Sequence, residues 1–196
     1  MSFGYGVLRF LALASLVLSA LMGDARADRA ADAAWEALRM GGHIALMRHA
    51  RAPGIGDPAG FRLEDCATQR TLSAAGRADA KAIGAAMRAR AVPVAGVYSS
   101  QWCRCLETAR LLELGDVVAF EPLNSFFTRQ ENKAPQLAAL RSWIAGARME
   151  GSAIFVTHQV VVTALSGIFP RPGEIVVGKP TADGALRIIG RIPPPS

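Results

Sequence analysis

Apolar and polar positions fall into blocks along this chain of 196 residues, and the blocks predict alternating helices and strands. Ala-rich stretches with apolar residues at helical spacing predict helices over residues 29–40, 73–90, 101–114, 135–147 and 160–168. Short continuous apolar runs predict strands buried on both faces of a sheet at 43–49, 94–99, 117–120 and 153–157. A closing hairpin is expected from 174–177 and 186–189. This alternation predicts a layered α/β domain with a largely parallel sheet.

The first residues do not fit this pattern. Arg9 is followed by an apolar run over residues 10–22 and then by Ala25-Arg26-Ala27, which is typical of a secretory signal peptide. The run is shorter than the roughly 20 apolar residues that span a bilayer, with an uncleaved anchor as the alternative. We predict cleavage after Ala27, a domain over residues 28–196, a periplasmic or secreted location and no stable membrane insertion of the mature chain.

An oxidising compartment changes the interpretation of the cysteines, because disulfides persist there. Cys66 is expected to pair with either Cys103 or Cys105, and the odd total of three cysteines leaves one thiol free. The chain has no C-x-x-C pair and only three histidines. The sequence therefore predicts neither a metal site nor a cofactor.

The formal net charge of +6 suits an anionic substrate or an anionic surface, and the alternative is a generally basic, solvated face. The arginines are scattered along the chain and form no dense run interleaved with aromatic residues. Nucleic acid is therefore not expected as a partner. Nothing in the pattern defines an oligomeric state.

Polar residues follow three of the predicted strands where each strand ends. Arg48 and His49 follow the first strand, Ser99 and Ser100 lead into Arg104, and His158 follows the late strand. In a parallel sheet, ligands bind beyond the carboxyl ends of the strands. Guanidinium groups bind phosphoryl oxygens in a fork, and imidazole can attack phosphorus or donate to its oxygens. The convergence of these side chains predicts a phosphate site.

These segments resemble the histidine phosphatase superfamily, also called the phosphoglycerate mutase-like family, over nearly all of the chain after residue 27. The motifs of that family match here at Arg48-His49-Ala50, at Ser99, Ser100, Arg104, Thr108 and Ala109, and at Thr157-His158-Gln159. The resemblance implies a three-layer α/β/α sandwich with a mostly parallel central sheet and the activity of a phosphatase.

By the same resemblance, His49 is the residue that becomes phosphorylated, and Arg48, Arg104 and His158 hold the phosphoryl oxygens. Ala50 replaces a glycine of the family motif and is expected beside the substrate. No metal is required. In-line attack needs His49 to be neutral at the attacking nitrogen, with its other nitrogen held by a hydrogen bond, for which a backbone carbonyl is the expected partner.

The proton donor is the feature that departs from the family. Many members carry a Glu in an L-x-E segment after the third strand, whereas this chain reads Leu123-Asn124-Ser125. Glu131 is the preferred candidate and Glu121 the alternative. Another branch places an Asp after the second histidine, where this chain has Gln159. A substrate with a good leaving group would need little proton donation.

These features predict a phosphatase for a phosphomonoester or a phosphoramidate, acting on a small-molecule or lipid-linked phosphate of the cell envelope. The alternative is a non-catalytic phosphate-binding protein that has lost its acid. Specificity is assigned to residues 51–70 and 124–133. His43 is expected to be structural, Trp102 to line the pocket or the core, and Arg70 to contact the substrate or the solvent.

Overall fold

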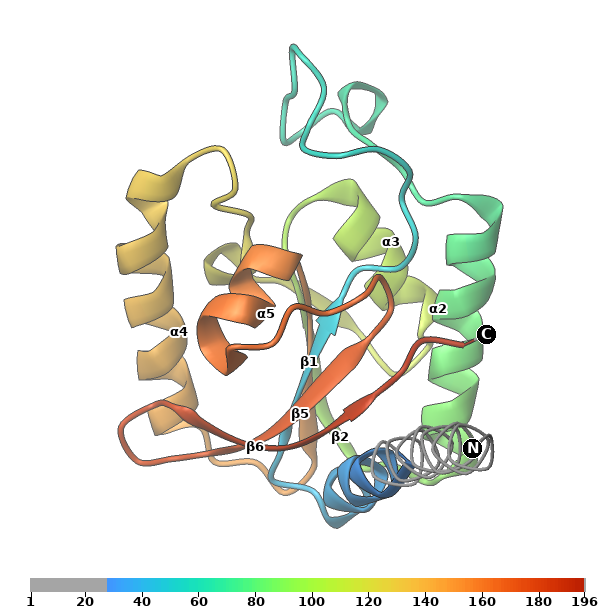
Figure 1. The fold of residues 1–196 in the computed structure, drawn as a ribbon, viewed down its shortest axis with the longest axis vertical. Coiled ribbons are helices and arrows are strands. Elements are labelled where there is room, and N and C mark those ends of the chain that lie inside the picture. The colour runs from blue at the N-terminus through green and yellow to red at the C-terminus, as the bar shows by residue number, and fades with distance from the viewer. Residues whose placement is uncertain (1–27, 196) are drawn as a thin grey trace, which may run out of the picture.

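The computed structural model describes residues 28–195, and the predicted signal peptide and its cleavage site lie outside them (Figure 1). A six-stranded sheet in the order β3-β2-β4-β1-β5-β6 forms the centre of the fold. The strands are β1 (Ile44–Arg48), β2 (Val94–Ser99), β3 (Val117–Ala119), β4 (Ser152–Thr157), β5 (Ile175–Pro180) and β6 (Leu186–Ile192). The helices of the described chain are a first helix over residues 28–40, α2 (Ala74–Ala89), α3 (Cys103–Leu111), α4 (Lys133–Gly146) and α5 (Gln159–Ser166).

The central strands are parallel and end at the same edge of the sheet. β1 pairs in parallel with β4, with Arg48 opposite Thr157, and β2 pairs in parallel with β4 and β3. Only β5 and β6 run antiparallel to their neighbours. The segments that follow β1, β2 and β4 therefore emerge side by side, as the sequence predicts for a ligand site.

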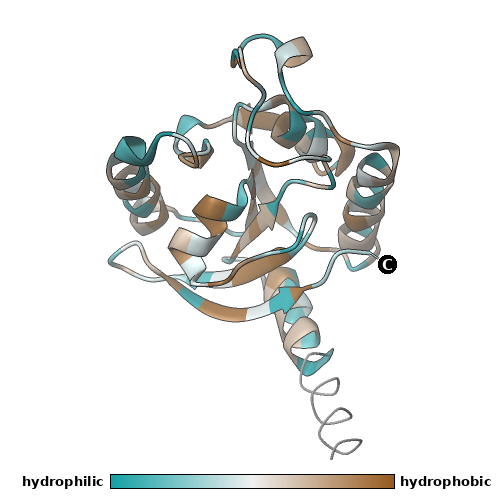
Figure 2. Cartoon of the chain, turned by 45° about the horizontal axis from the view of Figure 1, so that its top comes forward, coloured by the Kyte–Doolittle hydropathy of each residue, from teal (hydrophilic) through white to brown (hydrophobic). Residues whose placement is uncertain are grey.

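Helices cover both faces of the sheet, and this confirms the predicted three-layer α/β/α sandwich (Figures 1 and 2). Successive residues of β1 point to opposite faces. Ala45 and Met47 pack in one core with the first helix, α2 and α3, whereas Ile44 and Leu46 pack in the other core with α4 and α5. Both faces are buried, which explains why the strands read as continuous apolar runs.

The element boundaries differ from the sequence predictions in a few places. Helix α3 begins at Cys103 because Trp102, its N-cap, has an extended backbone. The hairpin strands β5 and β6 extend further than expected, and the loops contain three 3-10 helices (Cys66–Thr68, Glu121–Leu123 and Gln130–Asn132) that periodicity cannot reveal. Among residues 28–195, no helix has the length and apolar character needed to cross a bilayer.

Candidate active site

One guanidinium stands between the two histidines that follow β1 and β4. Nε of Arg104 donates to Nε2 of His49 at 3.3 Å, and Nη2 of Arg104 lies 3.4 Å from Nδ1 of His158. The two imidazole rings meet edge to face, with centroids 5.6 Å apart. All three side chains are buried. The fold therefore brings three of the four predicted phosphate-site residues into direct contact.

The hydrogen bonds of His49 assign a neutral imidazole with its lone pair at Nε2. Nδ1 lies 2.8 Å from the carbonyl oxygen of Ala50, so Nδ1 carries the proton and Nε2 accepts from Arg104. Burial, followed by the positive charge of Arg104, lowers the pKa of His49 to about 3. A nucleophilic imidazole requires this protonation state. The backbone carbonyl that the sequence analysis expected as a partner for His49 is thus present.

His158 belongs to a buried polar chain. Its Nε2 lies 2.8 Å from Oγ of Ser100, which in turn donates to Oδ1 of Asn124 at 3.2 Å. Because the Ser100 hydroxyl donates to Asn124, it accepts from His158, and Nδ1 of His158 is left with its lone pair toward Arg104. Burial, followed by the charge of Arg104, lowers the pKa of His158 well below its usual value. This imidazole is therefore neutral as well.

Arg48, the last residue of β1, is half-buried beside His49. Its Nη1 donates to the carbonyl oxygen of Pro170 at 3.0 Å. Its Nε is buried and has no hydrogen-bond partner among the described residues. An unpartnered buried donor costs about 1–3 kcal/mol, so an anion that reaches this nitrogen would remove the penalty.

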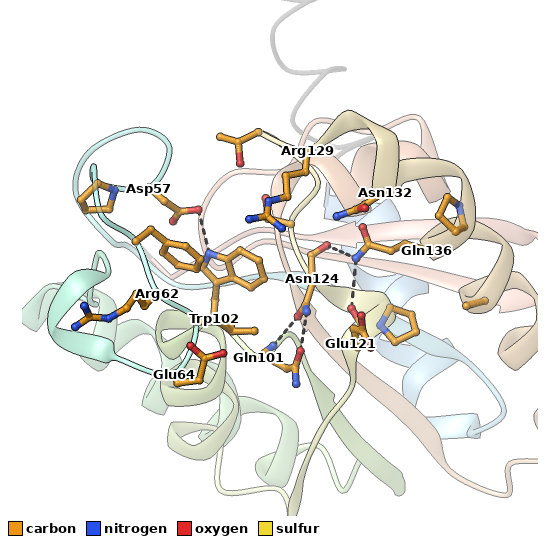
Figure 3. A pocket seen from close by; sticks show the side chains of 18 of the residues that line it. Asp57, Arg62, Glu64, Gln101, Trp102, Glu121, Asn124, Arg129, Asn132 and Gln136 are labelled. Atoms are coloured by element: carbon orange, nitrogen blue, oxygen red, sulfur yellow. Dashed lines mark hydrogen bonds between the residues drawn. The ribbon is translucent and has the colours of Figure 1, made fainter.

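A carboxylate that the sequence analysis did not single out contacts the same guanidinium. Oδ1 of Asp57 accepts from Nη1 of Arg104 at 2.8 Å. Oδ2 of Asp57 accepts from Nε1 of Trp102 at 3.1 Å (Figure 3). The side chain of Asp57 is 13% exposed, whereas that of Arg104 is 3% exposed. Asp57 thus stands at the boundary between the buried histidines and the solvent.

A disulfide fixes the long loop between β1 and α2 to the start of α3. Cys66 pairs with Cys103, which is one of the two pairings predicted from the sequence, and Cys105 is the buried free thiol. Phe61 of the loop stacks on Trp102 with ring centroids 5.1 Å apart. The loop stands beyond the edge of the sheet, above the ends of the strands (Figure 1). The disulfide and the aromatic contact therefore fix the loop that carries Asp57.

Arg70 braces the part of this loop that leads to Asp57. Its guanidinium donates to four backbone carbonyl oxygens, with Nε bonded to Gly56 at 2.6 Å and Nη1 to Ala52, Pro53 and Gly54 at 2.6–3.2 Å. From its sequence context, Arg70 is expected to be either a substrate contact or a surface residue. The structure shows that its hydrogen bonds order the loop.

A cleft of about 940 Å³ is lined by Asp57 and Trp102, which contact the cluster (Figure 3). Residues 57–64 form one wall, and the segment from Glu121 to the first half of α4 forms the other. Gln101, Asn124 and Gln136 contribute amide groups, and Arg129 contributes a guanidinium. This lining offers many hydrogen bonds to a polar substrate.

The remaining predicted residues make no hydrogen bond to Arg104 within residues 28–195. Glu131 is exposed on a 3-10 helix and is absent from the cleft lining, whereas Glu121 does line the cleft.

Ala50 is fully buried and its N–H donates to Oγ1 of Thr108, so Ala50 supports His49 and exposes no atom to a substrate. His43 is buried at the opposite end of β1 and contacts the carbonyl oxygen of Gly41. Within residues 28–195, no three His, Cys, Asp or Glu side chains are grouped as metal ligands would be.

The family model for the histidine phosphatase superfamily (branch 1) matches residues 44–124. Over this segment the chain is similar to the histidine phosphatase superfamily. The matched segment contains Arg48, His49 and Arg104, and the sheet geometry adds His158 from beyond it. This similarity supports the phosphatase that the sequence predicts. No curated protein matches the sequence.

Solved structures share the fold. YhfR of Bacillus stearothermophilus is 18% identical with a TM-score of 0.55, covering 77% of this chain and 96% of that one. The alpha-ribazole phosphatase from Shigella flexneri is 11% identical with a TM-score of 0.56, covering 79% and 98%. The protein histidine phosphatase SixA complexed with tungstate is 15% identical with a TM-score of 0.52, covering 76% and 95%. At these identities the similarity establishes the fold alone.

Asp57 and the hydrogen bond from Ser100 to Asn124 are members of the site that the sequence does not predict. The residue types gave one usable signal. Asp57 lies in a loop rich in Gly and Pro that is too long to be neutral in a compact domain, and loops of that length are commonly functional. No spacing rule connects this aspartate with Arg104.

Proposed function

We propose that this protein hydrolyses a phosphomonoester or phosphoramidate through a phosphohistidine formed on His49. The observation that supports this proposal most directly is the contact between Nε of Arg104 and the lone pair of Nε2 of His49. A guanidinium at this point holds an incoming phosphoryl group beside the atom that attacks it. Arg48, with its unpartnered Nε, supplies a further donor.

The reaction proceeds in two displacements at phosphorus. Nε2 of His49 attacks, the N–P bond forms, and the bond to the leaving oxygen or nitrogen breaks. Water then attacks phosphorus, the N–P bond breaks, and inorganic phosphate leaves. Charge in each transition state spreads over the equatorial oxygens, so catalysis rests on the cationic donors around them. The proton stays on Nδ1 of His49 throughout and remains hydrogen-bonded to the carbonyl oxygen of Ala50. This hydrogen bond keeps Nε2 oriented toward the phosphorus atom.

In this proposal His158 holds a phosphoryl oxygen, and this role requires an N–H donor at Nδ1. In the structure its Nδ1 presents a lone pair to Arg104. A dianionic phosphate beside the ring favours its protonated form. His158 therefore gains a proton at Nδ1 when the substrate binds and donates it in a charge-assisted hydrogen bond, while Nε2 remains bonded to Ser100.

We further propose that the substrate is a phosphate outside the cytoplasm, carried by a sugar or a lipid of the cell envelope. The disulfide between Cys66 and Cys103 supports an oxidising compartment, and so does the signal peptide expected from the sequence. The polar lining of the cleft supports a leaving group with many hydroxyl or amide groups. Glu131 stays a sequence-based candidate for the acid.

The test uses the chain from residue 28, produced with its disulfide intact. Turnover of p-nitrophenyl phosphate is measured at mildly acidic and neutral pH for the unmodified chain and for His49→Ala. His43→Gln is the matched histidine control, because His43 lies at the far end of β1. We expect His49→Ala to lose at least about 1,000-fold in kcat, since a nucleophile is removed, and His43→Gln to retain activity.

Detection of the intermediate completes the test. A rapid quench followed by mass spectrometry should find acid-labile phosphate on His49. A chain that binds phosphate but shows neither turnover nor phosphohistidine would instead be a phosphate-binding protein, and the proposal would fail. A panel of sugar, lipid and protein phosphates then identifies the substrate by the highest kcat/KM.

A further inference from the structure

A histidine phosphatase needs a proton for its leaving group, and the family position for that acid is filled here by Leu123-Asn124-Ser125. The amide of Asn124 is committed to Ser100 and to Gln101. Glu131 is exposed on a short 3-10 helix outside the cleft lining. Among the carboxylates of residues 28–195, only Asp57 pairs with Arg104.

We propose that Asp57 is the acid that protonates the leaving group, an inference that rests on the proposed function. In the structure its carboxylate bonds to Nη1 of Arg104, where a phosphoryl oxygen would bind. The substrate therefore exchanges with Asp57 on the guanidinium and leaves the displaced carboxyl group beside the scissile bond.

The position of Asp57 relative to the nucleophile supports this role. His49 and Asp57 bond to different nitrogens of Arg104, His49 through Nε and Asp57 through Nη1. His49 is buried, whereas Asp57 lines the cleft. In-line displacement sends the leaving group away from the nucleophile, and the cleft offers it space. The leaving group accordingly departs on the side where Asp57 lies.

Displacement also changes which charged groups lie next to Asp57. In the structure Asp57 is paired with the cationic guanidinium of Arg104. Once Arg104 bonds to the phosphoryl group, Asp57 loses that partner and faces an anion. Nε1 of Trp102 still donates to the second oxygen of Asp57 and holds the displaced carboxyl group at this place.

The proton transfers balance over the two displacements. In the first, the carboxylic acid of Asp57 gives its proton to the leaving oxygen as the P–O bond breaks, which yields an alcohol and a carboxylate. In the second, this carboxylate takes a proton from the attacking water as the O–P bond forms and the N–P bond to His49 breaks. Asp57 thus returns to the acid form as phosphate is released, and it re-forms the pair with Arg104 after giving that proton to solvent.

The experiment compares leaving groups. We measure kcat/KM of the unmodified chain and of Asp57→Asn for p-nitrophenyl phosphate, phenyl phosphate and glycerol phosphate, whose leaving groups need increasing help from an acid. General acid catalysis contributes about 100-fold to 10,000-fold. We expect Asp57→Asn to lose that factor with glycerol phosphate and less than about 10-fold with p-nitrophenyl phosphate. Asp116→Asn, an exposed aspartate outside the cleft lining, is the matched control.

A loss of the same size for every leaving group would overturn the inference, because a residue that only positions Arg104 affects all substrates equally. The same holds if Glu131→Gln, and not Asp57→Asn, shows the leaving-group dependence. Thermal unfolding checks that each variant is folded, and Asp57→Glu tests for partial recovery with glycerol phosphate. If the unmodified chain forms no phosphohistidine, the proposed function itself fails. If it does form one and Asp57→Asn responds uniformly, only the role of Asp57 is lost.

Discussion

Nε of Arg104 donates to Nε2 of His49 at 3.3 Å, while the other two nitrogens of the same guanidinium reach His158 and Asp57. A planar fork serves several partners at once, whereas a lysine ammonium is a point charge on a flexible stem. Arg104→Lys should therefore lower kcat for p-nitrophenyl phosphate by about 100-fold to 1,000-fold. Arg77→Lys, an exposed residue paired with Glu107, is the control and should be unaffected. Full activity in Arg104→Lys would mean that positive charge alone is sufficient.

The two buried imidazoles make stability depend on pH. Burial and the charge of Arg104 keep the folded pKa of His49 at about 3, and the charges of Arg48 and Arg70 act in the same direction. The unfolded chain takes up a proton below about pH 6.5 and the folded chain does not, so stability falls as pH drops from about 6.5 toward 3. His49 alone should cost about 1.4 kcal/mol at about pH 5.5, and His158 adds to the loss.

Urea unfolding at about pH 7 and about pH 5.5 measures this dependence. His49→Gln should show a smaller difference between the two pH values, because one of the two titrating groups is gone. Equal differences in the two proteins would mean that His49 is protonated in the folded state.

The disulfide should contribute to both stability and activity. Cys66 and Cys103 are 37 residues apart, and closing a loop of that length in the unfolded chain corresponds to about 3–4 kcal/mol. Cys66→Ser should lose about that much stability in urea unfolding and should also lower kcat/KM, since the disulfide holds the cleft wall. A reductant should lower the free energy of unfolding of the unmodified chain and leave that of Cys66→Ser unchanged. A chain whose kcat/KM survives reduction would show that noncovalent contacts alone hold the wall.

Arg70 offers a separate test of loop order. Arg70→Lys keeps the charge but cannot serve four carbonyl oxygens in one geometry, so we expect a loss of about 1–3 kcal/mol. Hydrogen exchange of residues 52–57 should speed up, and kcat/KM should fall with Asp57 less fixed. Arg62→Lys, in the same loop but exposed and paired with Asp65, is the control for stability. Unchanged hydrogen exchange of residues 52–57 in Arg70→Lys would show that the hydrogen bonds of Arg70 do not order this loop.

The sheet and both core faces follow from the sequence because burial on two sides leaves an unmistakable apolar run. The run that became β1 predicts both the strand and the place where Arg48 and His49 emerge. The start of α3 was harder to predict from the sequence, because Trp102 has an extended backbone and contacts Asp57 and Phe61. Tertiary packing set this boundary, and periodicity carries no record of such packing.

The site could be predicted only in part, for a similar reason. His49, Arg104 and His158 each follow or begin an element whose position in the sheet is implied by topology. Asp57 lies in a loop whose course depends on a disulfide and on Arg70, and neither the pairing of Cys66 nor the partners of Arg70 can be derived from residue types. The loop conformation decides which carboxylate reaches Arg104.

The parallel pairing of β1 with β4 has a consequence for how activity appears during folding. Arg104 is 55 residues from His49 and 54 from His158 along the chain, so the three side chains meet only after distant segments have closed on one another. Long-range parallel pairing is slow to form because the entropy of closing the chain is lost before its contacts are gained. A chain in which these segments have not yet paired has His49 but lacks Arg104 beside it. Recovery of turnover on refolding should therefore follow the last step of sheet formation and lag behind the earlier gain of helical signal.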